Sequence, residues 1–275
     1  MSTIKKIDLI KNAKLNMANT IINKTNLGNI NLKEINNIGI DELEWMVPNE
    51  ESNNQNTNIS YNFEKAVEVT SQAEIVPSIE EFSKSLTNSK YNDLENFNNH
   101  IKKKVQKAGY GTREGIVAAA MALAYDYAKN TGKKLFYNDP GTSTDEYREG
   151  ITEDIKFDCR GFVWWSLYNG GFKWPENDKG ELLNHSYEFF DWINEKGYTR
   201  ETYDSGEIGD IVLKIGDNNH VMLIVGKYDD GYYIAEEAGH NSGLIVSKRD
   251  FSELEEKQYT ITDLTEYYDD NNNKR

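Results

Sequence analysis

The sequence predicts an α+β fold, in which helices pack on an antiparallel sheet. Between about residues 91 and 195 the apolar positions recur every three or four residues, which is the spacing of helices. From Ile208 onward they form short β-branched or aromatic runs separated by turn sequences. Helices followed by an antiparallel meander are typical of the α+β class.

The first 90 residues differ in composition from the rest of the chain. They are rich in Asn, and residues 49–58 form a low-complexity polar stretch typical of a flexible linker. Short apolar patches before this stretch predict one or two short helices. We therefore expect two parts: residues 1–90, a partly disordered Asn-rich N-terminal region and linker, and residues 91–275, the folded domain.

The folded domain is expected to begin with two helices. The first is amphipathic and ends at Gly109. Thr112 is a suitable N-cap for the second helix, residues 113–130, whose Ala-rich apolar surface predicts burial on most sides. The polar stretch 138–156 predicts a long loop. The apolar face of the first helix is formed by Leu94, Phe97, Ile101 and Val105.

Two more helices and a set of strands are expected after this loop. Asp158 is a good N-cap for a helix over residues 159–169, which Gly170 would end. A further helix is predicted over residues 182–195. The expected strands cover residues 210–215, 220–228, 231–237 and 244–248, with another at 259–262.

Composition and charge exclude several classes of partner. The 275 residues carry a formal net charge of −15, which argues against binding to nucleic acid, whose phosphates need basic surfaces. The longest apolar run, Ile116–Tyr125, is about half of a membrane span. No signal peptide is visible at the N-terminus. We expect a monomer that does not bind nucleic acid and has no membrane-spanning segment.

The single cysteine, Cys159, is the strongest sign of chemistry in the chain. A thiol at the start of a helix is more easily ionised, because the backbone N–H groups there favour the thiolate. About 60 residues later His220 opens a predicted strand. A thiol and an imidazole so placed indicate covalent catalysis. His100 and His185 lie on predicted helices and are expected to face solvent.

A third polar group is needed to orient the imidazole, and two neighbouring residues are candidates. Glu236 and Glu237 lie in the strand that follows His220. Side chains alternate between the two faces of a strand, so only one of them can face the histidine. The spacing of cysteine and histidine residues does not fit a zinc site. We expect neither a metal nor another cofactor.

Three motifs in order carry a resemblance to a known family. They are Asp-Cys-x-Gly-Phe at Asp158, Gly-Asp-Ile-Val at Gly209, and His-Val-x-x-Ile-Val-Gly at His220. Together they resemble the NlpC family of papain-like cell-wall cysteine peptidases, over about residues 109–265. The resemblance implies a papain-like arrangement and makes residues 91–275 the NlpC-like catalytic domain.

The resemblance also implies roles for individual residues. Cys159 would be the nucleophile, His220 the base, and Glu236 the third polar residue. Tyr137 would be the tyrosine that hydrogen-bonds near the thiol. Arg160 stands where the family usually has Ser, which would change the charge near the substrate. The residues expected to support the site or bind substrate are Tyr137, Asp158, Arg160 and Glu237.

The expected function is that of a bacterial cysteine peptidase. It would hydrolyse amide bonds in peptidoglycan stem peptides through a thioester acyl-enzyme. The family implies a secreted or cell-envelope location. One alternative keeps the fold and transfers the acyl group to an amine. Another is a catalytically silent binding module with an unreactive Cys159.

Overall fold

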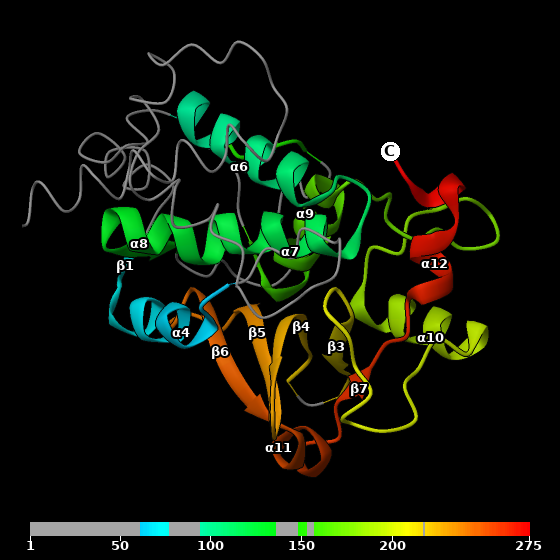
Figure 1. The fold of residues 1–275 in the computed structure, drawn as a ribbon. Helices are drawn as coiled ribbons and strands as arrows, with labels where there is room; N and C mark the ends of the chain where they lie inside the picture. The colour runs from blue at the N-terminus through cyan, green and yellow to red at the C-terminus, as the bar shows by residue number, and fades with distance from the viewer. Residues whose placement is uncertain (1–60, 77–93, 136–147, 153–156, 217) are drawn as a thin grey trace, which may run out of the picture. The chain divides into compact units, whose positions relative to one another are not determined.

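The computed structural model describes residues 61–76, 94–135, 148–152, 157–216 and 218–275. Residues Tyr61–Arg275 form one compact unit. Its centre is a five-stranded antiparallel sheet packed against helices, so the expected α+β class is correct (Figure 1). In the described ranges no helix has both the length and the apolar character needed to cross a bilayer.

The sheet is a meander whose strands have the order β6-β5-β4-β3-β7. Both of its faces are covered, because every residue of β5 is buried. A cluster that includes Met222, Tyr232 and Ile234 fills one face together with Leu254 of α11 (Phe251–Glu256). The strands are β3 (Ile211–Lys214), β4 (His220–Tyr228), β5 (Gly231–Glu237), β6 (Leu244–Asp250) and β7 (Thr260–Ile261).

Helices α7 and α9 pack on each other and on β4, on the other side of the sheet from α11 (Figure 1). They approach closely where glycines face each other. A Cβ atom on Gly170 would lie 2.7 Å from the Cα atom of Ile116. The helices of this layer are α6 (Leu94–Ala108), α7 (Arg113–Met121), α8 (Tyr127–Thr131) and α9 (Cys159–Gly170). Further helices follow as α10 (Ser186–Lys196), α11 (Phe251–Glu256), α12 (Thr265–Asp269) and a 3-10 turn at Asn271–Asn273.

The predicted helix over residues 113–130 contains a π-helical segment, Ala122–Asp126, between α7 and α8. Asp126, which ends this segment, is buried and accepts hydrogen bonds from Lys104 Nζ at 2.6 Å and His100 Nε2 at 2.7 Å. His100 therefore does not face solvent as expected, because it has a carboxylate partner on the neighbouring helix. His185 is exposed and precedes α10, which starts four residues later than predicted.

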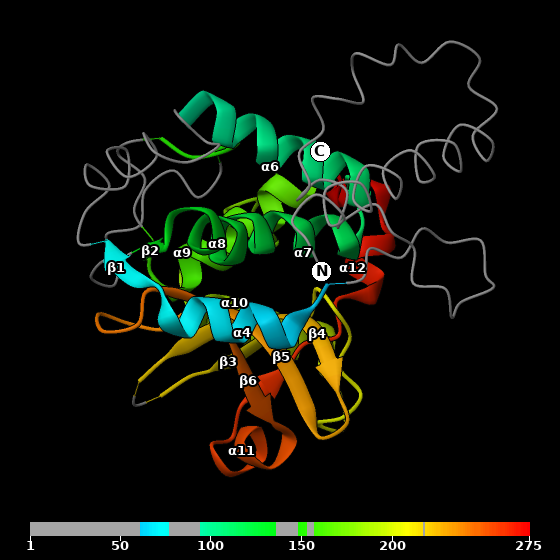
Figure 2. The same cartoon turned by 60° about the vertical axis from the view of Figure 1, so that its left-hand side comes forward.

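The compact unit begins earlier than the expected boundary at residue 91. Helix α4 (Phe63–Gln72) packs on β6, as Figure 2 shows, and β1 (Glu74–Val76) pairs in parallel with β2 (Lys133–Leu135). The buried Thr70 accepts a hydrogen bond from the Val246 backbone N–H at 3.2 Å. The fully buried residues of α4 are Ala66 and Thr70.

Candidate functional site

The start of α9 holds the cysteine in a defined position. Asp158 is the N-cap, and its Oδ1 atom accepts the Gly161 backbone N–H at 2.7 Å. Its carbonyl oxygen accepts the Phe162 N–H at 3.1 Å. Cys159 is thus the first residue of the helix, and it is partly exposed. The thiol therefore lies where the N–H groups of the helix start favour a negative charge.

His220 reaches the same region from the end of the sheet. It is the first residue of β4, and its Nε2 atom lies 2.7 Å from Glu236 Oε2. The register pairs Leu223 with Ala235, which puts His220 and Glu236 on one face as diagonal neighbours. The structure thus joins Glu236, and not Glu237, to the histidine.

The imidazole also lies near the Cys159 thiol, which contributes to the pKa of the ring. Since Nε2 is engaged by Glu236, Nδ1 is the ring atom left for the sulfur. Burial disfavours the charged ring, but the hydrogen bonds and charges of Cys159 and Glu236 outweigh it and raise the pKa of His220 to about 9. The ring therefore carries a proton near neutral pH.

Glu236 is a fully buried carboxylate with three partners. Its Oε1 atom accepts hydrogen bonds from Arg249 Nη2 at 2.7 Å and from the Ser247 hydroxyl. Burial alone would raise the pKa of this carboxyl, yet His220, Arg249 and Ser247 hold it below its usual value. Glu236 is therefore ionised at neutral pH and fixes the orientation of the His220 ring.

Ser247 and Arg249 were not predicted as part of the site. Both lie on β6, which pairs with β5 so that Ser247 is opposite Ile234 and Arg249 is opposite Tyr232. Their side chains point to the Glu236 face only because of this register. Ser247 and Arg249 are two residues apart in β6, and this spacing indicates that their side chains lie on one face of the strand. The sequence does not show the register in which β6 pairs with β5.

Glu237 lies on the opposite face of β5, toward α9. It is 0% exposed, and neither of its carboxyl oxygens has a hydrogen-bond partner in the described part of the chain. Burial and then the neighbouring Cys159 raise the pKa of this carboxyl well above its usual value. The two adjacent glutamates therefore differ: Glu236 is charged and paired, whereas burial disfavours the charged form of Glu237.

The other predicted residues differ in how far they can be placed. Arg160 is the second residue of α9 and is partly exposed, with its guanidinium 5.5 Å from the centre of the Trp164 ring. Arg160 follows Cys159 in the sequence, but its guanidinium lies over the ring of Trp164. Tyr137, and most of the expected loop 138–156, fall outside the described residues.

Asp210 has a structural role that the sequence did not reveal. It is 0% exposed and accepts hydrogen bonds from Arg113 Nη1 at 2.7 Å and Arg200 Nη2 at 2.9 Å. Arg113 is the first residue of α7, so this pair ties the helix layer to the start of β3. An arginine that opens an otherwise apolar helix was the available signal for a buried acidic partner.

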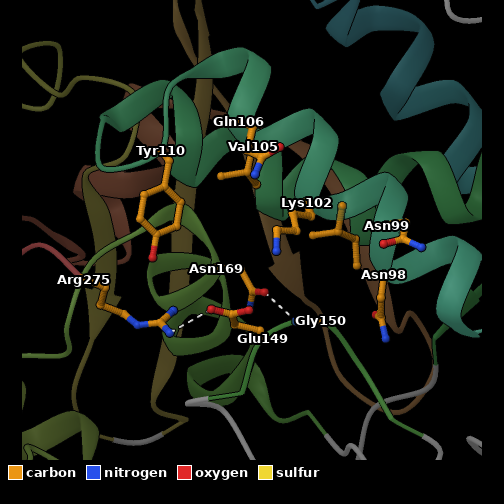
Figure 3. A pocket seen from close by; sticks show the side chains of 11 residues that line it. Asn98, Asn99, Lys102, Val105, Gln106, Tyr110, Glu149, Gly150, Asn169 and Arg275 are labelled. Carbon is orange, nitrogen blue, oxygen red and sulfur yellow. Dashed lines mark hydrogen bonds and ion pairs between the residues drawn. The ribbon is translucent and has the colours of Figure 1, made fainter.

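A separate hollow of about 420 Å³ lies between α6 and Gly150, near Asn169 at the far end of α9 from the thiol (Figure 3). The Tyr110 and Lys102 side chains point into it, and Arg275 pairs with Glu149 at 3.1 Å. Its lining contains no cysteine or histidine. It is thus distinct from the Cys159–His220–Glu236 site.

The comparisons with known proteins give no relative for this chain. No protein-family model, no curated protein and no solved structure matches it significantly. Within the described ranges, no three side chains of the His, Cys, Asp and Glu types gather as they would around a metal ion. The chemistry that this site can perform follows from the thiol, the imidazole and the buried carboxylate.

Proposed function

We propose that this protein is a papain-like cysteine peptidase that cleaves amide bonds through a thioester. The observation that carries the proposal is the nearness of the Cys159 thiol to His220, whose Nε2 atom bonds the buried carboxylate of Glu236 at 2.7 Å. A nucleophile, a base and a group that orients the base are the minimum set for covalent acyl transfer.

The reaction uses the proton held by His220. The Cys159 thiolate bonds to the carbonyl carbon of the scissile amide, and His220 gives its proton to the departing amine. The acyl group remains on Sγ as a thioester. A water molecule then attacks the thioester carbon while His220 takes one of its protons. The carboxylic acid leaves, and the thiolate and the protonated ring are restored.

The oxyanion formed in each step needs hydrogen-bond donors. The backbone N–H of Cys159 at the helix start is a suitable donor, because the first N–H groups of a helix have no partner within it. Asp158 supports this role indirectly, since its cap fixes the first turn of α9. Removing one such donor typically slows acyl transfer by about 100-fold or more.

Two observations support the papain-like arrangement and the NlpC assignment. The cysteine starts a helix that packs on an antiparallel sheet, and the histidine and the acidic residue lie on adjacent strands of that sheet. The three sequence motifs fall at α9, β3 and β4. By this resemblance the substrate is a peptidoglycan stem peptide and the site of action is the cell envelope.

Purified peptidoglycan provides the direct test. The wild-type protein should release peptides with new amino groups, and Cys159→Ala and His220→Ala should release none. His185→Ala is the matched control, because His185 is exposed and precedes α10. Release by Cys159→Ala at the wild-type rate would refute the proposal. Added amines that divert the product into amides would indicate the transferase alternative.

A further inference from the structure

Arg249 is a cation that the mechanism above does not use. Its Nη2 atom donates to Glu236 Oε1 at 2.7 Å, while the other carboxylate oxygen, Oε2, lies 2.7 Å from His220 Nε2. Glu236 is 0% exposed, so one buried negative charge has a cationic partner on each side. One cation is enough to balance the charge of a buried carboxylate. The second cation therefore calls for a functional reason.

Arg249 belongs to a row of alternating charges that runs from the site to the surface. Its Nη1 atom donates to Glu253 Oε1 at 3.1 Å, and the same oxygen accepts a hydrogen bond from Lys257 Nζ at 2.7 Å. The guanidinium is partly buried and has a carboxylate at each end. Its position beside Glu236 is thus fixed by β6, which carries Arg249, and by α11, which carries Glu253.

Other polar and titratable groups lie near the pair formed by His220 and Glu236. Among them, Arg249 is the cation that bonds the carboxylate directly, and a guanidinium keeps its charge at every pH that a folded protein tolerates. The groups around the pair are Cys159 of α9, Lys214 opposite His220 on β3, Glu237 on the opposite face of β5, Ser247 and Arg249 of β6, and Tyr259 before β7.

A cation that shares a carboxylate weakens its attraction for a proton on a neighbouring group. With Arg249 in place, the pKa of His220 is already raised to about 9. The proposed mechanism requires the ring to give its proton to the departing amine, and a ring with a much higher pKa would be a poorer acid for this step. An unshared charge on Glu236 would raise the pKa in that direction.

We propose that Arg249 is a positioning residue that shares the carboxylate of Glu236 with His220 and so limits how strongly the ring retains its proton. This inference rests on the proposed role of His220 as the proton donor to the leaving amine. The guanidinium binds Oε1 and leaves Oε2 to the ring. Arg249 itself gives up no proton during the reaction.

An NMR titration of the His220 ring from neutral to alkaline pH tests this role. Arg249→Gln removes the charge but keeps a hydrogen-bond donor for Glu236 Oε1. The pKa of His220 should then rise by about one unit, which makes the ring roughly tenfold weaker as an acid. His220→Gln identifies the ring signal among those of the four histidines.

Three further variants separate charge from packing. Arg249→Lys keeps the charge and should restore the titration of the wild type. Arg249→Met makes the same test as Arg249→Gln with an apolar side chain if the glutamine does not fold. Lys248→Gln is the matched control, because Lys248 lies on the same strand but pairs with Glu64 Oε1 at 2.6 Å, away from the site. Thermal unfolding shows which variants are folded.

Three results would overturn the proposal. A wild-type titration in the folded neutral variants, with only a lower unfolding temperature, would leave Arg249 with a structural role. A fall in the pKa of the ring would mean that Arg249 holds Glu236 against His220 and does not share it. Equal shifts in Arg249→Lys and Arg249→Gln would mean that charge is not the acting property.

The titration does not depend on peptide cleavage, so the two proposals can fail separately. The expected rise in a protein that never cleaves peptidoglycan would contradict the proposed function alone. An unshifted ring in an Arg249→Gln protein whose wild type cleaves peptidoglycan would contradict this inference alone.

Discussion

His220 and Glu236 form an ion pair of 2.7 Å across two adjacent strands, with the carboxylate fully buried and the ring partly exposed. The carboxylate is in turn held by Arg249 and Ser247 of the next strand. The orientation of the imidazole is thus set by three strands of one sheet. The thiol of Cys159 comes from the helix packed on that sheet.

Replacing Glu236 with Gln should lower kcat/KM by about 100-fold or more. The amide preserves the size of the side chain but removes the charge that favours the protonated ring, so the pKa of His220 should fall. Steady-state rates and the NMR titration of the ring measure the two effects. Glu253→Gln is the matched control, because Glu253 also pairs with Arg249 but does not contact His220. Equal losses in both variants would contradict this role.

The stability of the protein should depend on pH through His220. Its pKa rises from 6.5 in the unfolded chain to about 9 in the folded one. The stabilisation from the charged ring is therefore fully present below pH 6.5 and is lost as the pH rises through about 9. This loss should be on the order of 3 kcal/mol.

Urea unfolding at pH values on either side of this window measures the effect. The wild type should lose stability across it, and His220→Gln should lose less because its amide does not titrate. The carboxyl of Glu236 changes stability in the opposite direction. Because its pKa is lowered, its charge stabilises the fold at pH values above the usual pKa of a glutamate, and this stabilisation is lost as the pH falls into the acid range. An identical alkaline loss in His220→Gln would show that the ring is not the titrating group.

Replacing Asp210 with Ala should destabilise the fold without touching the reacting groups. The change removes the carboxylate closest to the partly buried guanidinium groups of Arg113 and Arg200 and leaves them only the more distant Glu207 in common. Breaking such a buried pair costs about 3–5 kcal/mol. Urea unfolding measures the loss, and Asp191→Ala, an exposed acid on α10, should leave stability almost unchanged. A loss below that of an ordinary surface substitution would contradict the anchoring role.

The N-terminal limit of the folded unit can be tested by truncation. A chain of residues 61–275 should keep the cooperative unfolding and thiol reactivity of the whole protein. A chain of residues 91–275 should be much less stable, because it lacks α4 and the bonds of Thr70 to Val246. It also lacks the stacking of Phe63 on Tyr233, whose ring centres are 5.0 Å apart. Equal unfolding free energies for the two truncated chains would contradict this boundary.

Most of the secondary structure was predictable because its signals are local. The bounds of β4 and β5 agree with the expected strands, since turn residues flank alternating or β-branched runs. Asp158 and Thr112 were predicted as N-caps, and both side chains accept helix-start N–H groups. These features depend on a few neighbouring residues.

What could not be predicted depends on residues far apart in the chain. Whether Glu236 or Glu237 faces His220 follows from the register between β4 and β5. The pairing of His100 with Asp126 depends on how α6 packs against the π-helical segment. Local spacing contains none of this information.

Covalent capture of the acyl group tests the central claim most directly. The protein is mixed with stem-peptide fragments of peptidoglycan, quenched in acid at short times, and analysed by intact-protein mass spectrometry. The account predicts an added acyl mass on Cys159 that hydroxylamine removes, and no added mass or product with Cys159→Ala. Product formation at equal rates by the wild type and Cys159→Ala, without an adduct, would contradict it.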